Sequence, residues 1–322
     1  MPVYQGERFV ATAIGSVLAQ TYPAIELVIV NDGSTDKSAA IIKQFLPHPK
    51  IRYIEQTNSG VADARNTAIG NSSGALVALL DQDDQWLPDK LACQVDYLET
   101  HPDVSFVHTR VECIDAIGAA CSCIGAIADY PYQGRRVGQL LLGNRITAST
   151  VLMRASCIDN TGMFDQRFAP ADDWELWLRI ARLHTVGFID SATALYRIHG
   201  ANVSNDRVTM QRAALKVIDS IAQRFPEVLN DIGASQLVDA RCRVINGAAE
   251  ALEQCGRAGE ARSCWKATYI ANGNFTALLA LLGLQAKKRN KMQKLISSKP
   301  WLERRLKWYA YKLSKWLETK RE

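Results

Sequence analysis

Three aspartates stand close together at the end of an apolar run. Asp81, Asp83 and Asp84 directly follow ALVALL at residues 75–80. Their like charges repel one another, and a hard divalent cation would relieve that repulsion because Mg²⁺ and Mn²⁺ prefer oxygen ligands. A cation held there would also attract a ligand that carries phosphate. An Asp-x-Asp pair is by itself a weak signal, since acidic pairs are common on solvated loops, but its position after an apolar segment strengthens the prediction of a metal site.

The elements that must position these carboxylates alternate in type along the first 110 residues. Strand patterns are expected over 25–31, 51–56, 75–81 and 104–111, and helical patterns over 10–18, 34–46, 60–70 and 89–101. Ser34 or Thr35 is the expected N-cap of the second of these helices. This alternation predicts an α/β fold with a doubly wound, mostly parallel sheet flanked by helices. Ligands of such sheets bind at the carboxyl ends of the strands, where Asp32 and the three aspartates fall.

After residue 110 the expected secondary structure is first mixed, then all-helical, and the chain ends in a basic tail. Residues 149–153 and 185–189 have strand-like patterns, and a helix is expected to start near Asp172. From residue 206 onward the periodic segments are helical, and residues 246–271 resemble one helical hairpin of the tetratricopeptide kind. The prediction is a catalytic-type domain over 1–205, an all-helical extension over 206–286 and a basic amphipathic tail over 287–322.

Composition excludes several classes of protein. The chain has 322 residues, 48% hydrophobic and 22% charged, which is typical of a soluble globular protein. No apolar run is long enough for a transmembrane helix, and no signal peptide is expected. The eight cysteines form no CxxC pair, so we expect reduced thiols in a cytoplasmic protein, although Cys121-x-Cys123 could bind a metal. Neither a P-loop nor a GxGxxG motif is present, which argues against nucleotide triphosphatases and dinucleotide dehydrogenases.

The chain resembles the family 2 glycosyltransferases of the GT-A fold, of the bacterial surface-polysaccharide type. The resemblance covers about residues 1–205 and does not include the helical end. It lies in six ordered motifs: PVYQGERF (2–9), SVLAQTYPAIELVIVNDGSTD (16–36), NSGVADARNTAIG (58–70), LLDQDDQWLPDKL (79–91), FAPADDWELWLRIA (168–181) and YRIHGANVS (196–204).

The resemblance implies an inverting, metal-dependent hexosyltransferase that moves a sugar from a nucleotide-diphosphosugar to the hydroxyl of a saccharide or lipid-linked acceptor. It implies Mn²⁺ or Mg²⁺ as the cofactor, which neutralises the leaving diphosphate. The metal ligands it implies are Asp83, Asp81 and His199. The implied donor-binding residues are Pro2, Tyr4, Asp32, Arg65, Asp81, Gln82 and Trp86, with Asp32 accepting from the nucleobase. Competing interpretations are an N-cap for Asp32, a surface salt bridge for Arg65, a packing role for Trp86 and a structural role for His199.

The motif PADDWELW carries the implied general base, which takes the proton of the acceptor hydroxyl. Asp173 is the expected base, and Asp172 stands where the family usually has Glu. A carboxylate close to other carboxylates can have a raised pKa, which suits a base that works near neutral pH. Both residues could instead cap the helix that begins there, so either assignment of the pair stays open.

The start of the chain departs from the family pattern. An apolar strand normally precedes the first motif, but here Met1 stands directly before Pro2, and Gln5 replaces the usual Asn. We therefore expect the functional protein to begin upstream of Met1, with about six more residues of strand. The departure also raises an alternative function, a non-catalytic GT-A scaffold or interaction protein. Retention of Asp32, Asp81, Asp83 and Asp173 together argues against that alternative.

The C-terminal tail is strongly basic. Residues 287–322 hold 13 Lys or Arg against 3 Asp or Glu, whereas the remainder of the chain is mildly acidic. Apolar residues at positions 302, 306, 309, 313 and 316 share one face of a predicted helix, and the rest of its surface is largely cationic. That pattern is typical of a helix in the interface of an anionic membrane, and it suits this role better than nucleic-acid binding. We expect a cytoplasmic enzyme at the inner face of the membrane; packing of the tail on the domain is the alternative.

Overall fold

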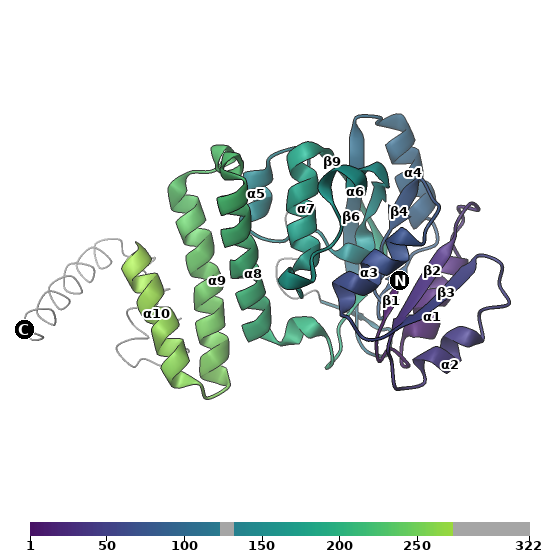
Figure 1. Cartoon of the computed structure of the whole chain (residues 1–322), viewed down its shortest axis with the longest axis horizontal. Helices are drawn as coiled ribbons and strands as arrows, with labels where there is room; N and C mark the ends of the chain where they lie inside the picture. Colours follow the sequence, from purple (N-terminus) through teal and green to yellow (C-terminus); the bar gives the residue numbers. More distant parts are fainter. Residues whose placement is uncertain (123–131, 273–322) are drawn as a thin grey trace, which may run out of the picture. The chain divides into compact units, whose positions relative to one another are not determined.

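The computed structural model describes residues 1–122 and 132–272 of the chain (Figure 1). These residues form two compact units. The first comprises Met1–Asn205 and Lys216–Ile232, and the second comprises Asp206–Leu215 together with residues 233–272. The expected change at residue 205 coincides with the first change of unit. Residues 216–232, which were expected to belong to the extension, return to the first unit. The expected tail over 287–322 lies outside the described residues.

Strands and helices alternate through the first unit, as the sequence predicts. The strands are β1 (Pro2–Val3), β2 (Leu27–Asp32), β3 (Ile51–Gln56), β4 (Leu76–Ala78), β5 (Gln85–Trp86), β6 (Val104–Ile114), β7 (Ala120–Cys121), β8 (Leu152–Arg154) and β9 (Thr185–Arg197). The α-helices are α1 (Val10–Leu18), α2 (Ser38–Lys43), α3 (Val61–Gly70), α4 (Lys90–Thr100), α5 (Val137–Leu141), α6 (Ser156–Thr161), α7 (Asp172–Leu183), α8 (Arg207–Arg224), α9 (Ala234–Gln254) and α10 (Ala258–Asn272). The 3₁₀ turns are η1 (Ala148–Thr150), η2 (Gln166–Phe168), η3 (Val203–Asn205) and η4 (Pro226–Asp231).

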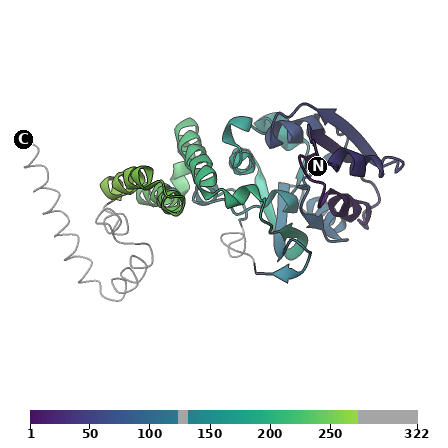
Figure 2. The same ribbon diagram turned by 90° about the horizontal axis from the view of Figure 1, so that it is seen from below.

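The strands of the first unit form two sheets. β1, β2 and β3 make a parallel sheet in that order, and β4, β8, β6, β9 and β5 make a mixed sheet in which β6 and β9 are parallel neighbours. The expected α/β class is therefore confirmed, with parallel pairing concentrated in the first sheet. Figure 2 shows the same elements from below, and in both views the N-terminus lies among the strands.

The first four residues of strand β2 are apolar because this part of the strand is covered on both faces. Val28 and Val30 pack with Ala64 and Ala68 of α3. Their neighbours Leu27 and Ile29 pack with side chains of α1, α2 and α4 on the opposite side. Successive side chains of a strand point to opposite faces, so a stretch covered by apolar side chains on both sides is apolar at consecutive positions, as Leu27–Val30 are. This burial fixes the carboxyl end of β2, where Asp32 stands.

Helix α2 begins later than expected. Its first residue is Ser38, whose backbone N–H donates to Asp36 Oδ1 at 2.9 Å. The expected caps are engaged elsewhere, since the Ser34 hydroxyl accepts from the Gln5 backbone N–H and the Thr35 hydroxyl accepts from the Gln5 side-chain amide. The capping expectation for Ser34 or Thr35 is therefore wrong.

Residues 216–232 are bonded into the first unit by polar contacts. Lys216 Nζ donates to the carbonyl of Arg167 at 2.6 Å, and Arg224 Nη1 donates to the buried carboxylate of Glu175 at 3.0 Å. The backbone N–H of Gly138 donates to Asp231 Oδ2 at 3.2 Å. A Cβ on Gly138 would lie 2.6 Å from the carbonyl of Val228, so only glycine permits this close approach. The end of α8 and η4 are thus part of the first unit's packing.

The second unit contains the predicted helical hairpin. Helices α9 and α10 are joined by a turn in which Gly256 has a φ of +73°, a conformation that glycine adopts without strain. Leu252, Ala261 and Trp265 are buried between them, and Trp265 Nε1 donates to Glu253 at 2.8 Å. No described helix is long and apolar enough to cross a membrane.

The cysteines differ in state among the described residues. Cys93, Cys121, Cys157, Cys242, Cys255 and Cys264 carry free thiols. Cys113 is disulfide-bonded, so the expectation of reduced thiols is wrong at this position. Cys123 lies outside the described residues.

Candidate active site

The acidic motif forms a tight turn between β4 and β5. The backbone N–H of Asp84 donates to the carbonyl of Asp81 at 3.2 Å, which closes the turn. The Asp84 carboxylate points inward and is only 1% exposed. It accepts from Ser149 Oγ at 2.6 Å and from the backbone N–H of Arg197 at 2.9 Å. Burial, with the charges of Asp83 and Asp81, raises the pKa of Asp84 well above its usual value. Asp84 therefore anchors the turn from within.

Ser149 of η1 holds this turn from two sides. Its hydroxyl donates to Asp84 and accepts from the backbone N–H of Asp81 at 3.2 Å. Its carbonyl accepts from Trp86 Nε1 at 2.9 Å. Trp86 is 7% exposed and packs in the main apolar core, with the ammonium of Lys90 4.4 Å from its ring centroid. The structure thus gives Trp86 a packing role, and its expected contact with the donor stays a prediction.

Asp83 points to the segment that follows β9. Its Oδ2 lies 2.9 Å from His199 Nε2 and 3.4 Å from the Asn202 amide nitrogen. The His199 ring packs on Phe9, with ring centroids 4.7 Å apart. Partial burial, followed by repulsion from Asp81, raises the pKa of the Asp83 carboxyl. Two of the three residues that the resemblance assigns to the metal, Asp83 and His199, are therefore in direct contact.

This donor set fits a divalent cation that shares its coordination with a ligand. Among residues 1–122 and 132–272, no group of three or more His, Cys, Asp or Glu forms a ready-made metal cage. Mg²⁺ is usually held by one or two carboxylates together with substrate phosphates and water, so a complete cage is not required. Asp83 with His199, and Asp81 beside them, would supply such a partial set, and a cation there would remove the repulsion that raises the pKa of Asp83.

Arg65 of α3 connects the acidic turn to the start of α7. Its Nη2 donates to Asp81 Oδ1 at 2.7 Å, and its Nη1 donates to Asp172 Oδ2 at 2.8 Å. The guanidinium is buried, which disfavours its charge, but the carboxylates of Asp81 and Asp172 outweigh burial and raise its pKa. Arg65 is therefore an internal bridge, not a surface ion pair.

The two aspartates at the start of α7 have different surroundings. Asp172 is buried and bonded to Arg65, whereas Asp173 is partly exposed. The Asp173 carboxylate accepts from the Asn144 amide at 3.3 and 3.4 Å and from the backbone N–H of Trp174 at 2.6 Å. Burial and the charge of Asp172 raise the pKa of Asp173 to about 7. Asp173 is thus the member of the pair that can exchange a proton near neutral pH.

Asp32 is bonded to the segment before α3. Its Oδ1 accepts from the Gln56 amide at 2.7 Å and from the Ser59 N–H at 2.9 Å, and its Oδ2 accepts from the Gly60 N–H at 2.9 Å. Gly60 has a φ of +91° and lies against Gln166, so a side chain is not tolerated there. A carboxylate can accept about four hydrogen bonds, so Asp32 can take one further donor. Asp32 does not cap α2, the helix that follows it.

The end of β1 is tied to the acidic turn by one side chain. Gln82 accepts from the Tyr4 backbone N–H and donates to the Tyr4 carbonyl, both at 2.8 Å. A Cβ on Gly6 would lie 2.3 Å from the Gln82 amide oxygen, so glycine makes room for this side chain. Pro2 lies in β1, and the Tyr4 side chain is 48% exposed and so accessible to a ligand. The Gln82 side chain therefore fixes the backbone at Tyr4, just after β1.

Gln5 bonds the loop after β2. It has a φ of +51°, and its side-chain oxygen accepts from the N–H groups of Thr35 at 2.9 Å and Asp36 at 3.1 Å. The departure from the usual Asn thus preserves a side-chain amide at this position. The Gln5 side chain bonds this segment to the loop after β2, and Gln82 bonds it to the acidic turn after β4. The segment between β1 and α1 is thus fixed on two sides.

Sequence reasoning missed the residues that position this site. Ser149 and Asn144 come from segments without a chemical motif, and each is hydrogen-bonded to an aspartate of the site. Arg197 lies in the quoted motif YRIHGANVS, and its backbone N–H donates to Asp84. Asn202 lies within the quoted YRIHGANVS motif and contacts Asp83, so that motif was the available signal. The Arg197 guanidinium also donates to the Asp83 carbonyl at 2.9 Å.

One family profile matches just under half of the chain. The profile described as "Glycosyl transferase family 2" matches residues 1–156. Over these residues the chain is similar to the family 2 glycosyltransferases. This segment contains the acidic turn, Asp32, Arg65 and Ser149.

Similar curated proteins are named glycosyltransferases. An uncharacterized glycosyltransferase of Rickettsia prowazekii is 31% identical over 208 residues, which are 64% of each chain. One from Rickettsia conorii is 32% identical over 201 residues, covering 62% of this chain and 33% of that protein. The glycosyltransferase GlyA of Streptococcus pneumoniae is 45% identical over 102 residues, 31% of this chain and 14% of that protein. The chain thus spans less than two thirds of the length of these relatives.

Solved structures confirm the GT-A fold expected for family 2. Staphylococcus aureus TarS 1–349 in complex with UDP-GlcNAc has a TM-score of 0.59 at 16% identity, covering 88% of this chain and 91% of that one. The mannosyltransferase PcManGT from Pyrobaculum calidifontis in complex with GDP-Man and Mn²⁺ has a TM-score of 0.57 at 19% identity, covering 94% and 80%. At such identities the likeness concerns the fold.

Proposed function

We propose that this protein transfers a sugar from a nucleotide-diphosphosugar to an acceptor hydroxyl. The observation that carries the proposal is the continuous row of charges from Asp83 and Asp81 through Arg65 to Asp172 and its neighbour Asp173. One end offers oxygen ligands for a cation and its diphosphate, and the other offers a carboxylate whose pKa of about 7 suits a base. The family assignment and the nucleotide sugars bound to TarS and PcManGT support the same reaction.

The position of each site residue indicates its proposed role in the transfer. Asp173 accepts the proton of the acceptor hydroxyl as that oxygen attacks the anomeric carbon. Asn144 orients the Asp173 carboxylate, and Arg65 fixes Asp172 and Asp81 relative to one another. Asp32, with its remaining lone pair, accepts from the nucleobase, and the exposed Tyr4 ring covers the base. Gln82, through the Tyr4 backbone, aligns the nucleoside end with the acidic turn.

Asp83, His199 and Asp81 would hold Mn²⁺ or Mg²⁺ together with the donor diphosphate. The bound ion would supply Lewis-acid stabilisation of the charge that develops on the leaving diphosphate. The ion in the PcManGT complex is Mn²⁺, which supports a divalent cation in the present site. One base and one leaving-group site favour direct displacement at the anomeric carbon, so we infer inversion. We further propose that the transferred sugar is a hexose, as the family resemblance implies.

A screen of nucleotide sugars tests the proposal. Thermal unfolding is measured with UDP-, GDP- and dTDP-linked hexoses, each with and without Mn²⁺. We expect one donor to raise Tm, and a larger shift when Mn²⁺ is present, because the cation and the diphosphate complete each other's coordination. The same donor should release its nucleoside diphosphate during incubation. A non-catalytic scaffold would give neither the Mn²⁺-dependent shift nor the release, and that result would refute the proposal.

The acceptor is proposed to be a saccharide or lipid-linked hydroxyl at an anionic membrane surface during surface polysaccharide assembly, reached through the basic tail over 287–322. The charge of that segment supports the proposal, since each cation near an anionic leaflet contributes about 1 kcal/mol. We expect the full chain to sediment with anionic vesicles at low salt, and a chain ending near Lys287 to stay in solution. Equal partitioning of the two would contradict a membrane role for the tail.

A further inference from the structure

Lys90 is a buried lysine to which the proposed reaction gives no role. It is the first residue of α4 and is 0% exposed. Its Nζ donates to the side-chain oxygen of Gln94 at 2.6 Å and to the carbonyl of Val151 at 3.2 Å, and it lies 4.4 Å from the centre of the Trp86 ring. None of these partners carries a charge, so burial lowers the pKa of Lys90 to about 7. A buried amine costs stability, so what Lys90 contributes is the geometry of the groups that it bonds.

Gln94 lies one turn further along α4 and is equally buried. Its amide nitrogen donates to the carbonyl of Thr150 at 2.8 Å and to the carbonyl of Val107 at 3.4 Å. Its oxygen accepts from Lys90. Side chains four residues apart share one face of a helix, so the two polar side chains form a single unit directed at the backbone that follows η1.

The carbonyls of residues 149–151 are each held by a different side chain. Their donors are the Trp86 indole, the Gln94 amide and the Lys90 ammonium, in that order. The last carbonyls of a helical turn have no partner within the turn, and in a buried place they must be bonded elsewhere. All three donors come from β5 and the start of α4, which directly follow the acidic turn in the sequence. The backbone is therefore fixed at three consecutive residues.

Ser149 connects this fixed backbone to the acidic turn. Its hydroxyl donates to Asp84 at 2.6 Å and accepts from the backbone N–H of Asp81 at 3.2 Å. The second bond is already at the upper end of the usual range of about 2.7–3.2 Å, so a small shift of the Ser149 backbone would break it. The contacts therefore run from α4 through Ser149 to Asp81 and, two residues further, to Asp83.

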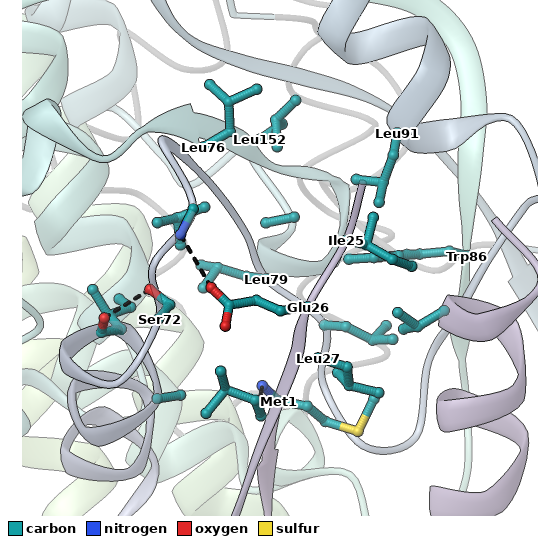
Figure 3. A pocket seen from close by; sticks show the side chains of 18 of the residues that line it. Met1, Ile25, Glu26, Leu27, Ser72, Leu76, Leu79, Trp86, Leu91 and Leu152 are labelled. Atoms are coloured by element: carbon teal, nitrogen blue, oxygen red, sulfur yellow. Dashed lines mark hydrogen bonds between the residues drawn. The ribbon is translucent and has the colours of Figure 1, made fainter. Parts of the chain in front are cut away.

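Apolar packing around the Trp86 ring is incomplete. The ring borders a cavity of about 290 Å³, which is also lined by Leu79, Leu91 and Leu152 (Figure 3). A side chain that faces a cavity lacks partner atoms on that side. The position of the ring therefore depends on its polar contacts, which are the bond from Nε1 to the Ser149 carbonyl and the ammonium of Lys90.

We propose that Lys90 and Gln94 are positioning residues of the metal site. By fixing the backbone at Ser149 they hold the acidic turn in the shape in which Asp81 and Asp83 can share a cation. The inference rests on the proposed function, in which this turn binds Mn²⁺ or Mg²⁺. Groups that orient metal ligands typically contribute about 10–100-fold to metal affinity. Because Lys90 and Gln94 act through one further residue, we expect the lower end of that range.

The test uses two substitutions in α4 and a matched control. Lys90→Met keeps the length of the side chain and removes its donors. Gln94→Glu keeps the acceptor for Lys90 and removes the donor to Thr150. Leu98→Ala is the control, because Leu98 is a core residue of the same helix and its truncation leaves a void. The readouts are the affinity for Mn²⁺ alone, followed by the EPR signal of free Mn²⁺, and the hydrogen-exchange rate of the Asp81 amide without metal.

Lys90→Met and Gln94→Glu are each expected to weaken Mn²⁺ binding by about 10-fold and to speed exchange at Asp81. Leu98→Ala should lower Tm and leave both readouts unchanged. Unchanged Mn²⁺ affinity in either folded variant would overturn the proposal. An equal loss in Leu98→Ala would also overturn it, since the effect would then be a general loosening of α4. If Lys90→Met fails to fold, Gln94→Glu decides, because it keeps the size of the side chain and gives Lys90 a counter-charge.

A double substitution tests the route through Ser149. Ser149→Ala is expected to weaken Mn²⁺ binding, and adding Lys90→Met should weaken it no further, because both changes remove the same constraint. Additive losses would contradict this route and overturn the proposal. A parent protein that binds no Mn²⁺ would refute the proposed metal site, and this inference with it. If the parent and the α4 variants bind Mn²⁺ equally, the proposed function stands and this inference alone is wrong.

Discussion

Replacing Asp83 by alanine is expected to abolish sugar transfer while the fold is retained. The Asp83 carboxylate is the central member of the proposed metal site, in contact with His199 and repelled by Asp81. A cation that stabilises a leaving phosphate contributes several kcal/mol, and about 4 kcal/mol corresponds to a loss of roughly 10³-fold in rate. The measurement is nucleoside diphosphate release with the donor found by thermal shift, before and after EDTA treatment of the unsubstituted protein.

Asp103→Ala is the matched control for this substitution. Asp103 is exposed, lies just before β6 and is remote in sequence from the acidic turn. Both variants are expected to unfold at nearly the temperature of the parent, since Asp83 is partly exposed and its pKa is raised, not lowered, by its surroundings. Full activity of Asp83→Ala, or of the parent protein in excess EDTA, would remove Asp83 from the metal site.

Replacing Asp173 by asparagine is expected to lower turnover by about 10²–10⁴-fold, the usual contribution of a general base. The raised pKa of about 7 gives the reaction a definite pH dependence. A base works in its ionised form, so kcat/KM of the parent should fall as the pH drops below about 7, in proportion to the protonated fraction. The asparagine variant should keep its affinity for the donor and lose this acidic limb.

Asp172→Asn tests whether Asp172 has a structural role, as the ion-pair partner of Arg65, or is itself the general base. Asp172 is the buried partner of Arg65, so its substitution weakens an internal ion pair and is expected to lower Tm more than Asp173→Asn does. The slope of kcat/KM below pH 7 should remain in this variant. If Asp172→Asn loses the acidic limb and Asp173→Asn retains it, the two roles must be exchanged.

The order of elements in the first unit could be predicted because each is set by local pattern. Residues 10–18 have helical spacing, and both faces of β2 are buried, so the apolar runs were sufficient. The start of α2 could not be predicted, because the choice among Ser34, Thr35 and Asp36 depends on Gln5, which approaches from the end of β1. The return of residues 216–232 to the first unit rests on single contacts such as Arg224 with Glu175.

Sequence motifs predicted the residues at the candidate site better than their partners. Asp83 and His199 lie in different motifs and meet in space, as the predicted metal site requires. Ser149 and Asn144 were missed because a hydroxyl and an amide become recognisable only when their partners are known. The family resemblance implies a donor contact for Trp86, with packing as the competing interpretation, and the structure places its side chain in the core.

The return of residues 216–232 to the first unit limits where this gene can be recombined. A crossover at the Asn205–Asp206 junction would separate the rest of the first unit from Lys216, Arg224 and Asp231, and would leave Gly138 without its contact to Val228. A crossover after Ile232 keeps these contacts but divides the second unit, since Val208 and Arg212 of α8 contact the helical hairpin. Chimeras at the second junction are therefore expected to be viable where the incoming hairpin keeps an apolar contact for Val208, and chimeras at the first junction are not.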